Sequence, residues 1–379
     1  MTTLTKPEPL KDKPLSGAVL EVDNLDVQFP TEDGLVRAVR GVSYTLRAGE
    51  VLGIVGESGS GKSVTSLAIM GLLPNSARVT GSVKFRGREL LGLGDKDFSK
   101  IRGKGIAMIF QDPMTSLDPV YKVGYQIAET VRQHDKNVSK KGALSRAADL
   151  LELVGIPNAK DRVTSYPHEF SGGMRQRVVI AIAMANQPDV IIADEPTTAL
   201  DVTVQAQILE VLGTAMEETG AATVLITHDL GVVAGVADRM LVMYAGRVVE
   251  SGPVDGVYYT PRMPYTLGLL GSLPRLDETE KTKLTPIKGS PPSMVNPPPG
   301  CPFGPRCPLH IAECDEAEPP LTEVEGGHWA ACIRNEKLEG HTEAAEFFDA
   351  DATDLTAPVL ADALPGSDAG TVTTSEDRK

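Results

Sequence analysis

Residues 56–63 read GESGSGKS, which matches the pattern G-x-x-x-x-G-K-[ST] of a phosphate-binding loop. The glycines let backbone N–H groups turn inward around phosphate oxygens, and a helix beginning in the loop adds its partial positive charge. Lys62 is expected to neutralise the β- and γ-phosphates of ATP, and the Ser63 hydroxyl to bind Mg²⁺. An apolar run, 51–55, precedes the loop and a helical pattern follows it, which argues against a chance glycine-rich turn. The candidate phosphate-binding residues are Gly56, Ser58, Gly59, Ser60, Gly61, Lys62 and Ser63.

A second candidate element is the run VIIADEP at residues 190–196, an apolar strand that ends in two carboxylates. Beside a phosphate-binding loop, Asp194 would hold Mg²⁺ and Glu195 would polarise the attacking water. Alone, an Asp-Glu pair at the end of a strand is more often part of a solvated loop. Together the two motifs predict a site for nucleotide hydrolysis, because phosphoryl transfer depends on charges positioned around the γ-phosphate.

The elements that must position these motifs alternate between short apolar runs and helical patterns. Besides the strand before the phosphate-binding loop, strands are expected at 106–110, 190–193 and 223–227. Helices are expected at 62–72, 141–154, 173–186 and 202–218. Such alternation predicts an α/β fold with a mainly parallel sheet. Residues 112–188 are mostly helical and are expected to form a helical subdomain inserted into this core.

Composition disfavours several classes of protein. The chain has 379 residues, with 37 Lys and Arg against 51 Asp and Glu, and a formal net charge of −14. Nucleic-acid-binding proteins normally carry a basic patch, so no nucleic-acid partner is expected. No apolar stretch is long enough to cross a bilayer and no secretory signal is visible, so a soluble or peripheral protein is expected.

Four cysteines occur, and their spacing is C-x5-C-x6-C-x17-C: Cys301, Cys307, Cys314 and Cys332. Thiols gathered in one segment of a protein from a reducing compartment favour a metal or cluster site over disulfides. The close C-x2-4-C pairs of structural zinc sites are absent, and the adjacent prolines suit a cluster held by irregular backbone. An iron–sulfur cluster, zinc and reduced structural thiols all stay open at this point.

The segment HEFSGGMRQRVVIAIAMANQPDVIIADEPTTALDVTVQAQIL, residues 168–209, resembles the nucleotide-binding subunits of ABC transporters. The resemblance implies a P-loop ABC ATPase fold, with a RecA-like core and a helical subdomain, and the cofactors ATP and Mg²⁺. It matches Ser171, Gly172 and Gly173 to the signature loop, which caps the γ-phosphate of ATP bound to a partner subunit. The form FSGGM departs from the commonest LSGGQ and is the variant of the peptide-importer branch.

Further family positions follow in order. Gln111 in IFQDPM corresponds to the Q-loop glutamine that touches Mg²⁺, and Asp201 in TALD to the D-loop that meets the other subunit. His228 in LITHDL corresponds to the switch histidine that contacts the γ-phosphate, so the resemblance assigns catalysis to Glu195, His228 and Gln111. Phe29 holds the place of the aromatic that stacks on adenine, and a core role for it stays open.

The cysteine segment carries a second resemblance. The runs PYTLGLLGSLP, residues 264–274, and KGSPPSMVNPPPGCPFGPRCP, residues 288–308, look like the C-terminal extension of oligopeptide and dipeptide importer ATPases. In relatives this extension is associated with a [4Fe–4S] cluster, which the resemblance carries over to the four cysteines, with zinc or free thiols as the alternatives.

Four parts of the chain are expected from these patterns. They are a flexible leader (1–18), an ABC nucleotide-binding domain (19–250), a small irregular cysteine-containing C-terminal domain (251–336) and an acidic, disordered tail (337–379).

The resemblance implies the ATP-hydrolysing subunit of an ABC importer for di- or oligopeptides, peripheral on the cytoplasmic face of the cell membrane. Its expected partners are two transmembrane permease subunits, a second, paralogous ATPase subunit and an extracytoplasmic substrate-binding protein. Import of nickel or another small solute by the same ATPase is the alternative. A soluble ABC ATPase of DNA repair or translation is disfavoured, because the chain has one cassette and no coiled-coil insertion. A redox-sensing module is the third hypothesis.

Overall fold

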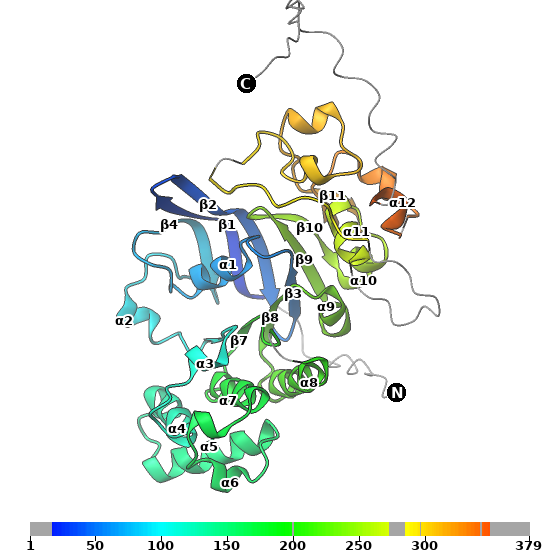
Figure 1. Cartoon of the computed structure of the whole chain (residues 1–379). Helices are drawn as coiled ribbons and strands as arrows, with labels where there is room; N and C mark the ends of the chain where they lie inside the picture. Colours follow the sequence, from blue (N-terminus) through cyan, green and yellow to red (C-terminus); the bar gives the residue numbers. More distant parts are fainter. Residues whose placement is uncertain (1–16, 199–200, 273–284, 296, 342, 349–379) are drawn as a thin grey trace, which may run out of the picture.

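The computed structural model describes residues 17–198, 201–272, 285–295, 297–341 and 343–348, and a mixed sheet lies at its centre (Figure 1). The strands of this sheet are β3 (Val51–Val55), β6 (Ile106–Ile109), β7 (Val190–Asp194), β8 (Ala222–Thr227), β9 (Arg239–Tyr244), β10 (Arg247–Pro253), β11 (Thr322–Glu325) and β12 (His328–Ala330). Their order across the sheet is β11-β12-β10-β9-β3-β8-β7-β6.

The five strands β9-β3-β8-β7-β6 run parallel, as the alternation of strands and helices predicts. Every residue of β7 and β8 is buried, which is typical of parallel strands covered on both faces. The carboxyl ends of β3, β7 and β8 therefore meet at one edge, which is where ligands bind in open α/β sheets.

A second, antiparallel sheet was not expected from the sequence. It contains β1 (Ala18–Thr31), β2 (Gly34–Arg47), β4 (Arg78–Phe85) and β5 (Arg88–Glu89), in the order β2-β1-β4-β5. Its apolar side chains join one buried cluster with those of β3 and of helix α1 (Lys62–Ile69). The helix that follows the phosphate-binding loop is thus fixed from two sides.

Helices fill the segment between β6 and β7. They are α3 (Pro113–Ser116), α4 (Val123–His134), α5 (Lys140–Leu153), α6 (Ala159–Arg162) and α7 (Gly172–Met184); the short α2 (Asp95–Phe98) precedes β6. The helices α4, α5, α6 and α7 pack around a shared apolar cluster together with α8 (Val202–Thr219), which follows β7. Figure 1 shows α4, α5 and α6 at the opposite end of the molecule from the cysteine region.

The C-terminal part continues the main sheet instead of forming a separate body. After α9 (Leu230–Val236), β9 and β10 come α10 (Val254–Tyr259), α11 (Pro264–Gly271) and an irregular segment with short 3-10 turns, then β11, β12 and α12 (Ala345–Phe348). Residue 250 lies inside β10, and Glu250 pairs with Ala330 of β12. The boundary expected at 250/251 falls within β10, and the division of the chain at that point stays a prediction. Within the ranges that the structure describes, no helix combines the length and the apolar character needed to span a bilayer.

The tail was expected to be disordered from residue 337, but its described residues, 337–341 and 343–348, include buried side chains. Leu338, Ala344 and Phe348 are buried and join the apolar cluster that also contains α11 residues. These side chains anchor the segment although its overall composition is acidic. Residues 349–379 of the expected tail and residues 1–16 of the expected leader lie outside the described residues.

Candidate nucleotide site and cysteine region

The phosphate-binding loop has the backbone geometry that only glycine permits at its ends. Gly56 has φ 149°, and a Cβ atom there would lie 2.2 Å from the carbonyl oxygen of Met243. Gly61 has φ 100°, and its Cβ would lie 2.5 Å from the Ala38 oxygen. The Lys62 Nζ donates to the carbonyl oxygens of Gly56 (2.7 Å) and Glu57 (3.0 Å), so the ammonium group lies within the loop.

Ser63 and Asp194 meet at the expected Mg²⁺ position. The Ser63 hydroxyl donates to Asp194 Oδ1 over 2.9 Å, although the two residues are far apart in sequence. Burial raises the pKa of Asp194, which the Ser63 hydrogen bond opposes. Burial also lowers the pKa of Lys62, which the carboxylates of Glu195 and Asp194 oppose. Two buried groups of opposite charge thus lie where a phosphate–metal complex would bind.

Glu195 is surrounded by polar side chains. Gln111 Nε2 donates to its Oε2 over 2.9 Å, and the Thr198 hydroxyl donates to the same oxygen over 2.8 Å. His228 Nδ1 lies 3.8 Å from that oxygen. Glu195 has a positive φ of 46°, which is uncommon for a residue other than glycine. Such strained backbone conformations cluster at functional sites. The structure therefore brings together Glu195, Gln111 and His228, and adds Thr198, which the sequence reasoning missed.

The signature loop and the D-loop lie at the starts of two adjacent helices. Ser171 caps α7, and its Oγ accepts from the Met174 N–H over 3.4 Å. Asp201 caps α8 in the same way. A Cβ atom on Gly173 would lie 2.6 Å from Val204 of α8, so only glycine fits this helix contact. Gly172, the first residue of α7, is exposed, as Ser171 is.

Phe29 lies in β1, opposite Val36 of β2. It is partly buried and packs against the apolar cluster of the antiparallel sheet. Stacking on adenine stays a prediction for this residue.

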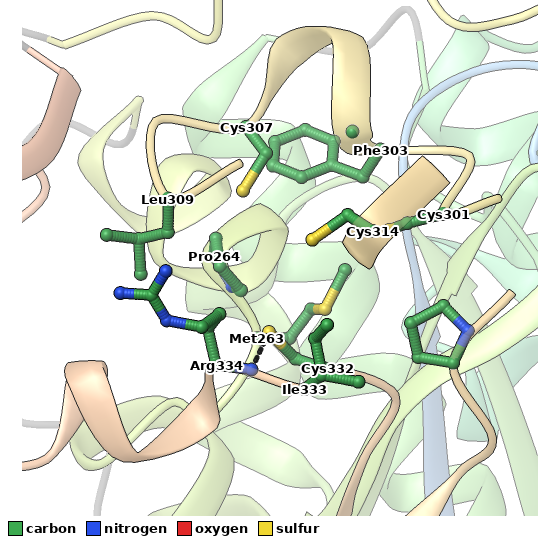
Figure 2. Close-up of a pocket in the computed structure, with 12 residues that line it drawn as sticks. Met263, Pro264, Cys301, Phe303, Cys307, Leu309, Cys314, Cys332, Ile333 and Arg334 are labelled. Atoms are coloured by element: carbon green, nitrogen blue, oxygen red, sulfur yellow. Dashed lines mark hydrogen bonds between the residues drawn. The ribbon is translucent and has the colours of Figure 1, made fainter. Parts of the chain in front are cut away.

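The four cysteines surround one largely apolar cavity (Figure 2). Met263, Phe303 and Leu309 line it together with the thiols, and all four cysteines are free of disulfides. The Arg334 N–H donates to Cys332 Sγ over 3.3 Å, and backbone groups also bond to Cys301 and Cys307. The four cysteines of the pattern C-x5-C-x6-C-x17-C thus lie around one cavity, although three come from loops and Cys314 comes from a short 3-10 turn.

Burial raises the pKa of Cys307 and of Cys332 to about 12. A metal would have to displace the thiol protons in order to bind here. Among the residues that the structure describes, no three His, Cys, Asp or Glu side chains come close enough together to hold a metal ion. The structure therefore does not show a metal site at the cysteines, and the iron–sulfur cluster expected from the resemblance stays a prediction.

One link between the two sites was missed by the sequence reasoning. Arg306, between two of the cysteines, forms a bidentate ion pair with Glu57 of the phosphate-binding loop, with N–O distances of 2.6 and 2.9 Å. The Glu57 N–H also donates to Tyr265 Oη over 2.8 Å. The sequence held one sign of this pair, which is the carboxylate of Glu57 inside the phosphate-binding loop. A carboxylate there repels phosphate unless a nearby cation neutralises it.

Comparison with known proteins gives two family matches on this chain. Over residues 39–198 the chain matches the ABC transporter family, and over residues 249–314 the C-terminal region of oligopeptide/dipeptide transporters. It is 59% identical over 326 residues to the oligopeptide transport ATP-binding protein OppD of Mycobacterium bovis, covering 86% of this chain and 53% of that protein. The chain thus spans about half the length of that relative.

A second relative is covered almost fully. The chain is 53% identical over 325 residues to the dipeptide transport ATP-binding protein DppD of Bacillus subtilis, covering 85% of this chain and 96% of that protein. A solved dimer of the ATP-binding cassette MJ0796, bound to ADP and Pi, is 27% identical with a TM-score of 0.56, covering 62% of this chain and 98% of that chain. The cassette fold and the C-terminal region occur here on one chain, which therefore belongs to the ATP-binding subunits of oligopeptide/dipeptide ABC transporters.

Proposed function

We propose that this chain binds and hydrolyses ATP and that the hydrolysis energises import of oligopeptides or dipeptides. The observation that carries the proposal is the convergence of Lys62, the Ser63–Asp194 pair and Glu195 at one edge of the sheet. Phosphoryl transfer needs little covalent help from the protein, so catalysis depends on placing these charges around the γ-phosphate.

Each side chain has a defined part in this reaction. Lys62, which now bonds to the loop carbonyls, would neutralise the β- and γ-phosphates, and Ser63 and Asp194 would hold Mg²⁺, whose charge would offset that of the phosphates. Glu195 orients and polarises the attacking water, and Gln111 and His228 fix the position of its carboxylate. The hydrogen bonds now made by Lys62 and Glu195 are available for exchange when ATP binds.

We further propose that a second, paralogous ATPase subunit completes the site. The signature residues Ser171, Gly172 and Gly173 begin α7, whose N-terminus attracts the γ-phosphate of ATP held by that partner. Asp201 and the exposed Val202 at the start of α8 then lie at the contact between the two subunits. Closure of the pair is the movement that two membrane permeases would transmit, with an extracytoplasmic binding protein supplying the substrate. The chain acts on the cytoplasmic face of the cell membrane.

Uptake of a labelled tripeptide by the source cell tests this function, with the wild-type chain or Glu195→Gln as the only copy. Loss of peptide uptake in the variant, with nickel entry unchanged, is the expected result. Peptide uptake that persists would overturn peptide import. Loss of nickel entry in its place would transfer the ATPase role to import of that metal.

We propose, in addition, that Cys301, Cys307, Cys314 and Cys332 hold a [4Fe–4S] cluster. Their common apolar cavity and the N–H donors at the sulfurs support this, because such donors are typical of clusters. Anaerobic purification followed by iron, sulfide and zinc analysis tests the proposal, and Cys314→Ser is expected to lose the iron. Zinc, or no metal, in the wild-type chain would contradict it.

The proposed division of the chain keeps a nucleotide-binding domain from 19 to about 250, with a helical subdomain over about 112–188, and a cysteine-containing part after it. Its support is the run of helices from α3 to α7 and the irregular backbone around the cysteines. Limited proteolysis of the full chain tests it: a stable fragment that spans residues 19 to about 250 is expected, and a first cut inside the central sheet would contradict the division.

A further inference from the structure

The phosphate-binding loop and the cysteine region are joined by one buried arginine. Arg306 has only 4% of its side chain exposed, and both of its terminal nitrogens bond to the carboxylate of Glu57. Its Nε donates to the Lys288 oxygen over 3.1 Å, and Nη1 also reaches Tyr244 Oη at 3.3 Å. This fork-to-fork geometry is the strongest kind of ion pair in proteins and fixes direction as well as charge.

An aromatic cluster packs against the guanidinium group of Arg306. Tyr244, Tyr265 and Phe303 are fully or almost fully buried, and their ring centroids lie 4.6 to 5.4 Å apart. The guanidinium of Arg306 lies over Tyr244 and Phe303. Phe303 also lines the cysteine cavity, as Figure 2 shows, so packed side chains run from the thiols to the phosphate-binding loop without interruption.

The contacts of Tyr265 and Arg306 fix the backbone of the phosphate-binding loop and neutralise its carboxylate, Glu57. The Tyr265 hydroxyl accepts the Glu57 N–H, which fixes the backbone between Gly56 and Ser58. Arg306 neutralises a carboxylate that otherwise stands in the loop where phosphate is expected to bind. Without the arginine, an unpaired negative charge would repel the triphosphate at short range.

We propose that Arg306 and Tyr265 are positioning residues for the phosphate-binding loop, and that through them the affinity for ATP depends on an intact cysteine region. The inference rests on the proposed ATP site and adds a second element that controls it. Arg306 is adjacent to Cys307, so any change that unfolds the backbone around the thiols also releases Glu57. Because linkage is reciprocal, ATP should in turn order the backbone of residues 301–307.

Equilibrium binding of a fluorescent ATP analogue with Mg²⁺ to the full-length chain tests the proposal. We expect Arg306→Ala to bind the analogue about tenfold more weakly, which corresponds to about 1.4 kcal/mol. Arg306→Lys keeps the positive charge but loses the bidentate hydrogen bonds of the guanidinium group. Its affinity for the analogue should therefore lie between those of the wild type and Arg306→Ala. Tyr265→Phe removes a single hydroxyl, and a loss of about threefold is expected. Arg262→Ala is the matched control, because Arg262 pairs with Glu339 and leaves the phosphate-binding loop untouched.

A rescue variant separates this role from general loss of folding. Adding Glu57→Gln to Arg306→Ala removes the unpaired carboxylate, so affinity should recover to within about threefold of the wild type. In the wild type, the ATP analogue should also slow amide hydrogen exchange at residues 301–307, and in Arg306→Ala it should not.

Four outcomes are decisive. Wild-type affinity in Arg306→Ala, or a double variant no better than Arg306→Ala, would overturn the positioning role. Equal exchange at residues 301–307 with and without the analogue would overturn the coupling. Failure of the wild-type chain to bind the analogue at all would instead overturn the proposed ATP site itself.

Discussion

In the nucleotide site the functional side chains follow regular strands, whereas in the cysteine region they project from turns that side-chain ion pairs hold in place. Asp194 and Glu195 follow β7, His228 follows β8, and the phosphate-binding loop follows β3. Backbone hydrogen bonds of the parallel sheet set their spacing. Around the cysteines, the backbone hydrogen bonds are those of short turns, such as the bond from the Cys301 N–H to the Cys314 oxygen, and the Arg306–Glu57 ion pair ties this segment to the phosphate-binding loop.

The difference shows where each region is vulnerable. Loss of one side chain from the nucleotide site leaves the sheet in place. Such a change should therefore lower the rate of hydrolysis with little effect on the stability of the fold. In the cysteine region one buried pair supports a long irregular segment, so folding is expected to fail together with any function. Three changes test this contrast, the first on the rate of hydrolysis and the others on stability.

Glu195→Gln should have the largest effect, and on the rate alone. Removing the group that polarises the attacking water is expected to lower hydrolysis about 1,000-fold, or about 4 kcal/mol, while ATP binding stays near the wild-type value. Steady-state hydrolysis in the assembled complex and equilibrium ATP binding measure the two separately. Glu210→Gln, an exposed carboxylate on α8, is the control. Hydrolysis at the wild-type rate would remove Glu195 from its proposed role.

Leu52→Ala and Leu309→Ala apply one chemical change to both regions. Leu52, in β3, is fully buried, so its truncation should lower the free energy of unfolding by about 4 kcal/mol. Leu309 beside the thiols is only partly buried, and about 1 kcal/mol is expected. Denaturant unfolding of the two variants measures both values. Equal losses would mean that the cysteine region is packed as tightly as the sheet.

His328→Ala breaks a buried pair at the join between the regions. His328 Nε2 lies 2.8 Å from Glu250 Oε1, and Glu250 is fully buried. Removal of the imidazole leaves the Arg262 N–H as the donor to Glu250 Oε1 and takes away the buried side-chain partner, so a loss of about 3 kcal/mol in the free energy of unfolding is expected. His310→Ala is the matched control, because His310 pairs with the exposed Asp315 and should lose about 0.5 kcal/mol or less.

The same variant has a pH dependence of known sign. Burial raises the pKa of Glu250 above the ordinary range of a glutamate. A carboxyl with a raised folded-state pKa contributes stability below its unfolded-state pKa and loses it as pH rises through the folded-state pKa. The loss caused by His328→Ala should therefore shrink as pH falls from neutral toward the ordinary glutamate pKa. A loss that grows on acidification would contradict this account.

Much of the nucleotide site could be predicted because each motif is local. The strand, the loop and the helix around Lys62 are continuous in sequence, and the apolar run before Asp194 and Glu195 identifies β7 directly. Thr198 was missed because a threonine three residues after a glutamate has no distinctive pattern. The folded start of the expected tail was missed because three buried side chains outweighed an acidic average.

The sequence by itself determined the phosphate-binding loop, the parallel core and the class of protein, because these depend on residues that are neighbours along the chain. Only the tertiary structure decided that Glu57 meets Arg306, that β12 extends the main sheet and that four cysteines line one cavity. Such contacts join residues separated by as many as 249 positions. Pairings at that distance depend on how the whole chain packs, and no local pattern of charge or hydrophobicity specifies them.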